Sequence, residues 1–222
     1  MRGLFVTGTG TEVGKTVVAA AIAHTLAASG ERVAVFKPAV SGLDELANGE
    51  EADHELLRRA AASDQGDEDV APYRFGPAVS PHLAAEMEGV VIDAGRLVAG
   101  ARAAAEGADV LISEGVGGLL VPLVGDYLVR DFARELGLPV VVAASPGLGT
   151  INHTLLTLEA ARAVGLDVEA VVFTPWPDLP SRMQRSNREA VERFGGVEVE
   201  TLRLLDLSDP GSWPNLGLGG PG

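Results

Sequence analysis

The chain has 222 residues, of which 46% are hydrophobic and 22% are charged, a balance typical of one globular domain rather than of a disordered or fibrous protein. Its net charge of −14 argues against nucleic acid or an anionic membrane surface as a partner, and the absence of cysteine excludes disulfides and thiol chemistry. Every apolar stretch is interrupted before the roughly 18 residues that a membrane span needs, so we expect a cytoplasmic protein that contacts no membrane.

Short runs of β-branched residues alternate with longer segments rich in alanine and leucine. The runs are apolar throughout, as in strands that are buried on both faces of a parallel sheet. We expect strands at 4–7, 33–36, 110–113, 140–144 and 168–174, and helices at 15–29, 53–62, 93–106, 128–136, 151–164 and 181–194. Five of these helices are followed by a glycine that can stop them, namely Gly30, Gly107, Gly137, Gly165 and Gly195. The pattern predicts a doubly wound, mainly parallel α/β fold with helices on both faces of the sheet.

Two segments depart from this alternation. Residues 43–82 are acidic and rich in proline, so we expect the helix at 53–62 to lead into an extended connection that faces a substrate. Residues 209–222 are rich in glycine and proline and are expected to be a poorly ordered tail. No linker separates two units, so the sequence predicts a single domain over residues 1–208.

The segment GTGTEVGKT, from Gly8 to Thr16, lies directly between the first expected strand and the first expected helix. The N–H groups of such a turn can converge on phosphate oxygens, Lys15 can reach the terminal phosphates, and the Thr16 hydroxyl can bind Mg²⁺. Strict Walker spacing would place the first glycine where the chain has Thr9, so the loop is a variant. Its position between strand and helix predicts a nucleoside-triphosphate site of the P-loop NTPase type.

Charged residues end two further strands. Glu114 follows the strand 110–113 and is a candidate to hold Mg²⁺ or its water, and the glycine-rich turn after it can approach a ligand closely. Lys37 follows the second strand, and a lysine in that place is most often a solvated side chain. The carboxyl ends of parallel strands share one crevice, however, which makes Lys37 a candidate second cation for the phosphates.

The motifs taken together resemble dethiobiotin synthetase, in order over residues 4–165. They are GTGTEVGKT, Lys37-Pro38 with Ser41-Gly42, Asp53, Ser80-Pro81-His82, Glu114-Gly115-Val116-Gly117-Gly118 and Leu148-Gly149-Thr150-Ile151-Asn152-His153. The resemblance implies an ATP- and Mg²⁺-dependent cyclo-ligase of biotin biosynthesis. It would join CO₂ to 7,8-diaminopelargonic acid as a carbamate, phosphorylate the carbamate to a carbamic-phosphoric anhydride, and close the ring to give dethiobiotin, ADP and phosphate.

The resemblance also implies roles for residues at matching positions. Lys15 and Lys37 would be catalytic, neutralising charge on the carbamate and the transferred phosphoryl group. The nucleotide would be bound by Glu12, Val13, Gly14, Lys15, Thr16, Val17, Asp53, Glu114, Gly115, Val116, Gly117, Thr174 and Pro175. The diamine would be bound by Thr11, Ser41, Gly117, Gly149, Thr150 and Asn152.

Magnesium would be held by Thr16, Asp53 and Glu114, with Asp44 as a rival to Asp53. Residues 147–152 would meet the carboxylate of the diamine at a helix N-terminus, across a homodimer interface. An alternative for this segment is a turn with Asn152 as the N-terminal cap.

The family's asparagine that reads the adenine edge is absent, because the last expected strand continues into Thr174-Pro175-Trp176-Pro177. We therefore expect ATP to be used with weak discrimination, so that other nucleoside triphosphates are also accepted. A P-loop ATPase switch of the partitioning or division-site type is the main alternative, but the loop lacks an early signature lysine and the chain lacks a basic face. An amide synthetase would need a nucleophilic cysteine, and a binding module without chemistry would leave Lys37, Ser41 and Glu114 without a purpose.

Overall fold

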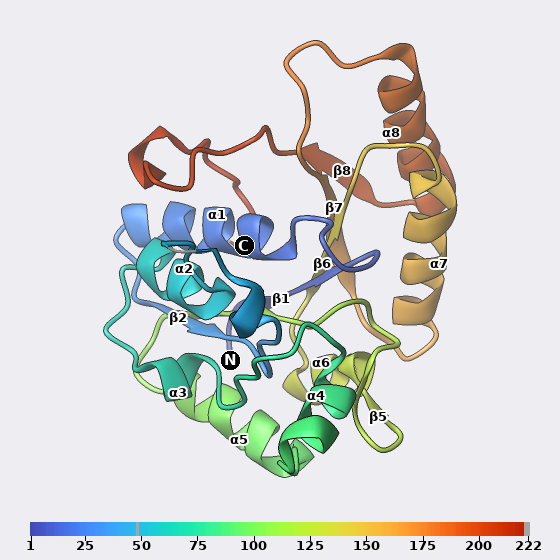
Figure 1. Ribbon diagram of the computed structural model, residues 1–222. Helices are drawn as coiled ribbons and strands as arrows, with labels where there is room; N and C mark the ends of the chain where they lie inside the picture. The colour runs from blue at the N-terminus through green and yellow to red at the C-terminus, as the bar shows by residue number, and fades with distance from the viewer. Residues whose placement is uncertain (48, 220–222) are drawn as a thin grey trace.

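The computed structural model describes residues 1–47 and 49–219, and its centre is a six-stranded sheet (Figure 1). The strands follow the order β2-β3-β1-β6-β7-β8, and every neighbouring pair is parallel. Their bounds are β1 Gly3–Gly8, β2 Val33–Phe36, β3 Val110–Glu114, β6 Val140–Ala144, β7 Val168–Phe173 and β8 Glu198–Thr201. A separate antiparallel pair joins β4 (Pro122–Val124) and β5 (Tyr127–Leu128). The parallel α/β architecture predicted from the sequence is confirmed.

Helices cover both faces of this sheet (Figure 1). One face packs against α1 (Lys15–Ala28), α2 (Asp53–Ala60) and the C-terminal segment, and the other against α5 (Ala94–Ala105), α6 (Val129–Leu136), α7 (Thr150–Arg162) and α8 (Arg182–Gly195). The remaining elements of the described residues are the helices α3 (Asp67–Val70) and α4 (Pro81–Glu88) and the 3₁₀ turns η1 (Leu43–Glu45) and η2 (Pro210–Ser212). None of the helices in these residues combines the length and the apolar character that crossing a bilayer requires.

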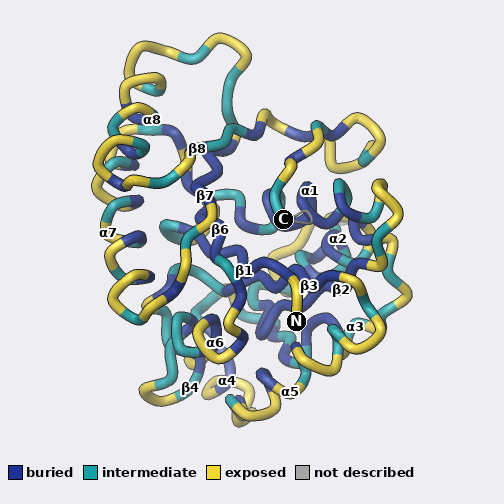
Figure 2. The backbone as a smooth tube through the Cα atoms, turned by 180° about the vertical axis from the view of Figure 1, so that it is seen from behind, coloured by how far each residue is buried: buried dark blue, intermediate teal, exposed yellow. Residues whose placement is uncertain are grey.

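The strands are apolar on both faces because each face meets a separate core. In β1, Leu4 and Val6 belong to the cluster under α1 and α2, whereas Phe5 belongs to the cluster under α5 and α6. All three side chains are fully buried, and the central strands form the dark interior of Figure 2. Burial on both sides explains why these runs do not alternate between apolar and polar residues.

The strand register sets the positions of the charged groups at the carboxyl end of the sheet. Phe36 of β2 pairs with Ser113 of β3, so the next residues along the two strands, Lys37 and Glu114, come side by side. Val6 of β1 pairs with Glu114, and the phosphate loop begins at Gly8, two residues after Val6. Three segments that are distant in the sequence therefore end at one crevice.

The structure corrects two expectations, one about the extended connection and one about the end of the last helix. The segment expected to be an extended connection carries α3 and α4, and α4 begins at Pro81, where proline fits the first turn of a helix. The last helix includes Gly195, and the residue that ends it in the left-handed conformation is Gly196, with φ of 55°.

The tail expected to be poorly ordered is packed in its described part, residues 209–219. Trp213 and Leu216 are 8% and 5% exposed and join the core cluster beneath α1. The Trp213 indole donates to the Asp206 carbonyl at 2.7 Å, and the Thr25 hydroxyl of α1 accepts from the Leu216 N–H at 3.1 Å. Two apolar anchors therefore outweigh the glycine and proline of the segment; residues 220–222 lie outside the described residues.

Candidate active site

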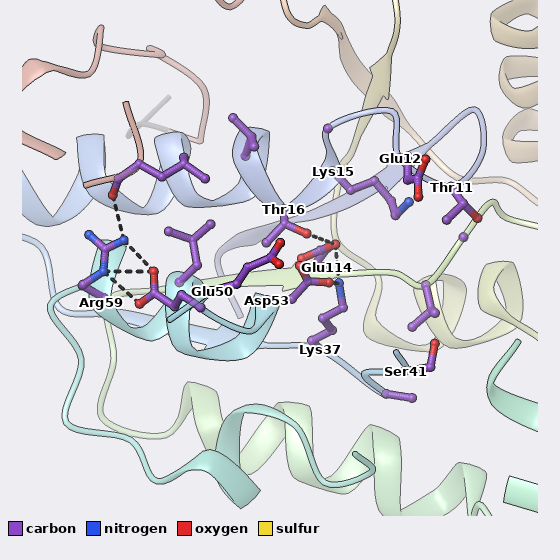
Figure 3. Close-up of a pocket in the computed structure, with 18 of the residues that line it drawn as sticks. Thr11, Glu12, Lys15, Thr16, Lys37, Ser41, Glu50, Asp53, Arg59 and Glu114 are labelled. Carbon is purple, nitrogen blue, oxygen red and sulfur yellow. Dashed lines mark hydrogen bonds and ion pairs between the residues drawn. The ribbon is translucent and has the colours of Figure 1, made fainter. Parts of the chain in front are cut away.

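A cavity of about 630 Å³ opens at the carboxyl ends of β1, β2 and β3 (Figure 3). It is lined by the phosphate loop and the start of α1, by the residues after β2 and β3, by α2, and by the C-terminal segment. Twelve of the residues that the resemblance implicates line it: Thr11, Glu12, Gly14, Lys15, Thr16, Val17, Lys37, Ser41, Asp53, Glu114, Val116 and Gly117.

The centre of the cavity is an ion cluster around Lys37 (Figure 3). The Lys37 Nζ donates to Glu114 Oε1 at 2.6 Å and to Asp53 Oδ2 at 2.6 Å. The side chains of Lys37 and Glu114 are 5% and 0% exposed. Removing either member of such a deeply buried ion pair lowers the stability of the fold, because the other charge is then buried without a partner.

The pKa values in the cluster reflect competition between burial and charge pairing. Burial alone lowers the pKa of Lys37, but the carboxylates of Glu114 and Asp53 outweigh burial and raise it. Burial also opposes ionisation of Asp53, yet the ammonium of Lys37 keeps the pKa of Asp53 below its usual range. For Glu114, which is fully enclosed, burial prevails and raises the pKa. The charged form of Lys37 is therefore the one that the site stabilises.

The oxygen atoms around this cluster suit Mg²⁺. The Thr16 hydroxyl donates to Glu114 Oε1 at 3.0 Å, while Glu114 Oε2 is buried without a hydrogen-bond partner. Among the described residues no group of three or more histidine, cysteine or acidic side chains forms a metal cage. A hydroxyl with two carboxylates still fits Mg²⁺, which commonly uses one or two carboxylates and takes its other ligands from water and phosphate.

Lys15 is the second ammonium in the cavity, and Lys15 and Lys37 are the two lysines in the sequence. Lys15 is 7% exposed, and its Nζ donates to the Gly10 carbonyl at 2.8 Å. Burial lowers the pKa of Lys15. The chain carries its other cations as arginine, so the compact point charges are concentrated at this site.

Glycine is required at two turns that shape the cavity. Gly14, at the N-terminus of α1, has φ of 88°, and a Cβ there would lie 2.5 Å from Thr174 Cγ2. Gly117 has φ of 62°, and a Cβ there would lie 2.7 Å from Val121 Cγ2. A larger residue at either position would meet both backbone strain and a packed neighbour.

Several residues implied by the resemblance do not line the cavity. Thr174 is 3% exposed and packs against the Gly14 turn behind the phosphate loop, which accounts for its absence from the cavity wall. A Cβ at Gly115 would meet Phe5 and Val129, so this turn faces the core. The other residues outside the cavity wall are Val13, Pro175, Gly149, Thr150 and Asn152.

The segment at the start of α7 differs from one of the two interpretations of the sequence. Its N-cap is Gly149, in the left-handed conformation, and no side chain caps this end, so the alternative role of Asn152 as the cap is wrong. Thr150 is buried, with its hydroxyl 3.4 Å from that of Thr154, while Asn152 is exposed. Leu148, just before the helix, is 92% exposed.

Asp44, the rival to Asp53 as the second carboxylate, also lies outside the cavity wall. Its backbone N–H donates to the Gly76 carbonyl at 3.0 Å, and its carboxylate sits against the same glycine. Asp53, at the start of α2, is the one in contact with Lys37. The geometry favours Asp53.

Part of the cavity wall comes from residues that no sequence motif indicates. The residues that were missed are Ala39, Gly49, Glu50, Glu51, Leu56, Arg59, Leu207 and Ser208. Arg59 stands on α2 six residues after Asp53, a spacing that places the two side chains on different faces of the helix, so the assignment of Asp53 does not predict it. Leu207 and Ser208 come from a segment with no motif, and only the fold brings them to the cavity.

Comparison with known proteins supplies the family. The family model described as AAA domain matches residues 2–201. The chain is 36% identical over 199 residues to the ATP-dependent dethiobiotin synthetase BioD of Bacillus subtilis (strain 168), covering 90% of this chain and 85% of that protein. It is 45% identical over 209 residues to the protein of the same name from Anaeromyxobacter sp. (strain Fw109-5), covering 94% and 92%.

Among solved structures, the chain is similar to a ParA family ATPase from Chlorobium tepidum TLS. The TM-score is 0.55, with 12% sequence identity over 94% of this chain and 88% of that one. At this identity the likeness shows a shared fold and carries no information about activity.

Replacing Lys37 by methionine tests the buried ion pair. We expect Lys37→Met to lower the free energy of unfolding by about 3–5 kcal/mol, because the buried carboxyl group of Glu114 then loses the ammonium that stabilises its charge. Adding Glu114→Gln should recover part of this loss, giving a coupling energy above about 1 kcal/mol in urea unfolding without ligands.

The exposed pair Arg58 and Asp67, with the same 2.6 Å separation, serves as a control and should couple by less than about 1 kcal/mol. Strict additivity of the Lys37 and Glu114 changes would contradict the interpretation.

Proposed function

The chain belongs to the family of ATP-dependent dethiobiotin synthetases, and we infer from this membership that it makes dethiobiotin from 7,8-diaminopelargonic acid, CO₂ and ATP. It is a cyclo-ligase of biotin biosynthesis with an ATP-binding P-loop. The observation that carries the residue-level proposal is the cluster of Lys37, Glu114 and Asp53 beside the phosphate loop. Because the reaction consumes ATP, we place it in the cytoplasm.

We propose a sequence of three bond changes. One amine of the diamine adds to CO₂ and loses a proton, forming a carbamate. A carbamate oxygen attacks the γ-phosphorus of ATP and displaces ADP, which leaves a carbamic-phosphoric anhydride. The second amine attacks the anhydride carbon, phosphate leaves, and the cyclic urea is closed. No enzyme side chain becomes covalently attached, so the protein acts by positioning and by charge stabilisation.

In this proposal Lys15 and Lys37 stabilise the negative charge that gathers around the transferred phosphoryl group. An ammonium has three N–H donors, and two of those on Lys37 are engaged by Glu114 and Asp53. The two carboxylates hold the ammonium in place, and the third donor is available to a carbamate or phosphate oxygen. Charge stabilisation by groups that are already oriented is usually the largest contribution to such catalysis.

We propose that Mg²⁺ is held by Thr16, Asp53 and Glu114 when the nucleotide is present. The ion supplies neutralisation of the phosphate oxygens. Two features of this chain support the proposal. The side chains of these three residues offer only oxygen atoms as ligands, and Oε2 of Glu114 is buried without a hydrogen-bond partner.

The diamine is proposed to lie against Thr11, Ser41 and Gly117, at the end of the cavity beyond Lys37. We also propose a homodimer, in which the start of α7 on one copy meets the carboxylate of the diamine bound to the other. Two observations support it: Gly149 and Thr150 do not line the cavity of their own chain, and Leu148 beside them is almost fully exposed. A dimer would cover that leucine and bring the helix N-terminus to an anion.

The principal test is an assay for product. With Mg²⁺, bicarbonate, ATP and 7,8-diaminopelargonic acid, the protein should form dethiobiotin, followed by mass, together with one phosphate for each product. Lys37→Ala should reduce kcat by at least about 100-fold, the scale expected for loss of one charge-stabilising group. ATP hydrolysis that does not respond to the diamine would contradict the ligase and favour a nucleotide switch.

The second carboxylate can be identified with a matched pair of variants. We expect Asp53→Asn to raise the Mg²⁺ concentration for half-maximal activity by at least about tenfold, because a carboxylate at the metal site is lost. Asp44→Asn makes the same chemical change outside the cavity and should leave that concentration unchanged. The reverse pattern would assign the role to Asp44.

Base selectivity is proposed to be weak, because the chain lacks the amide that would read a purine edge. In the product assay, kcat/KM for ATP should exceed that for CTP or GTP by less than about 100-fold, a gap of about 2.7 kcal/mol. A greater preference for ATP would mean that other groups of the chain read the base.

A further inference from the structure

Helices α7 and α8 lie side by side and are closely packed (Figure 1). A Cβ at Gly195 of α8 would lie 2.7 Å from Leu158 Cδ1 of α7. Two contacts from a side chain to the backbone also join the pair. At the end of both helices, Arg162 of α7 donates to the Gly195 carbonyl at 2.7 Å. Near their start, Asn187 of α8 donates to the turn that precedes α7, which is the segment proposed to meet the carboxylate of the diamine.

Asn187 is the polar member of the buried stripe of α8. The buried residues of this helix are Asn187, Val191 and Gly195, spaced four apart on one face. Asn187 is 7% exposed, and its Nδ2 donates to the Pro146 carbonyl at 3.1 Å and to the Gly147 carbonyl at 3.0 Å. An amide removed from water is stable only when protein groups replace the lost hydrogen bonds. The two carbonyls use both N–H donors of the amide, so the burial of Asn187 depends on this turn.

The contact fixes the direction of two peptide groups. The peptide bonds from Pro146 to Gly147 and from Gly147 to Leu148 are trans, so each N–H points opposite to its C=O. Because Asn187 holds both carbonyls, the N–H groups of Gly147 and Leu148 are directed away from it. Among the described residues, neither of these two N–H groups donates to another backbone carbonyl. The turn therefore presents two consecutive donors on the side opposite Asn187.

The start of α7 adds donors to this turn. Gly149 is the N-cap, with φ of 93°, and no side chain of the described residues caps this end. The first N–H groups of a helix have no acceptor within the helix, so they are available to an anion. Consecutive N–H groups of a turn form such an anion site together with a helix start. Leu148, in the middle of the segment, is 92% exposed, so the segment is accessible from outside.

We propose that Asn187 is a positioning residue for the diamine: its amide holds the carbonyls of Pro146 and Gly147, which keeps the N–H groups before and at the start of α7 directed at the carboxylate of the substrate. The inference rests on the proposed function, and in particular on the proposed contact between the start of α7 and that carboxylate.

The effect of Asn187 is confined to one substrate. Without the amide, the peptide group between Gly147 and Leu148 can rotate, because glycine on one side of it allows a wide range of backbone angles. Its carbonyl oxygen can then face the carboxylate and repel it. Asn187 does not line the cavity that holds the phosphate loop, so its loss leaves the nucleotide contacts in place.

Steady-state kinetics of dethiobiotin formation test the proposal with two variants of the full chain. Asn187→Asp keeps the shape of the side chain but replaces the donor nitrogen by oxygen, and Asn187→Ala removes the amide without adding charge. Both should raise KM for 7,8-diaminopelargonic acid by at least about tenfold, the scale of one hydrogen bond, and leave KM for ATP within about twofold and kcat within about threefold.

An analogue of the diamine separates positioning from a general loss of structure. In this analogue a methyl group replaces the carboxylate and both amines are kept. The unaltered protein should use it with a KM at least about tenfold above that for the diamine, and Asn187→Ala should change the KM for the analogue by less than about twofold. The variant has no further effect there because the contact that it disturbs is already absent.

Arg162→Ala is the matched control, because it removes the contact at the other end of the same two helices. It should leave KM for the diamine within about twofold. An unchanged KM for the diamine in both Asn187 variants would overturn the proposal, as would equal increases for the diamine and the analogue. An increase in Arg162→Ala as large as that in Asn187→Ala would also overturn it, since loosening of the helix pair would then be sufficient.

The same assay distinguishes failure of this inference from failure of the proposed function. If the unaltered protein formed no dethiobiotin, the proposed function would fail and this inference with it. If it formed dethiobiotin but used the analogue as readily as the diamine, only the carboxylate contact and the role of Asn187 would be overturned.

Discussion

The buried contact between Lys37 and Glu114 is the constraint on which the site depends. Charges removed from water are stable only when their partners are held accurately, and this pair is held by the register of β2 and β3. A one-residue slip of β2 against β3 would turn the side chains of β2 to the opposite face of the sheet and separate Lys37 from Glu114. The apolar core on both faces therefore does more than stabilise the fold, because it fixes the register that pairs these charges.

The choice of lysine follows from the same geometry. A guanidinium is planar and favours paired contacts in one plane, whereas an ammonium is compact and can direct its three donors to different partners. Lys37 contacts two carboxylates from different elements, one on β3 and one at the start of α2. The chain uses arginine for its surface and structural ion pairs, such as those of Arg32 and Arg59, and has lysine only at the cavity.

The parts of the fold with strong local signals could be predicted from the sequence. The buried strands and the phosphate loop have patterns that depend on a few adjacent residues, and the parallel architecture follows from them. The edge strand β8 was missed because Glu198, Val199 and Glu200 alternate polar and apolar, unlike the central strands. The tail was misjudged because its overall composition hid Trp213 and Leu216. Arg59 and Ser208 could not be assigned to the cavity, since their proximity exists only after α2 and the C-terminal segment have packed around α1.

Because the chain is acidic, the site must attract a polyphosphate through positive groups held close to the phosphates. With a net charge of −14, the long-range field of the protein opposes the approach of a polyphosphate, although salt screens this field beyond about 8 Å. Attraction must then come from short-range contacts, namely the loop N–H groups, the N-terminus of α1 and the two lysines. A lysine already committed to two carboxylates cannot cancel the whole charge of a triphosphate. The Mg²⁺ that we propose at this ion cluster would supply the positive charge that the two lysines leave uncompensated.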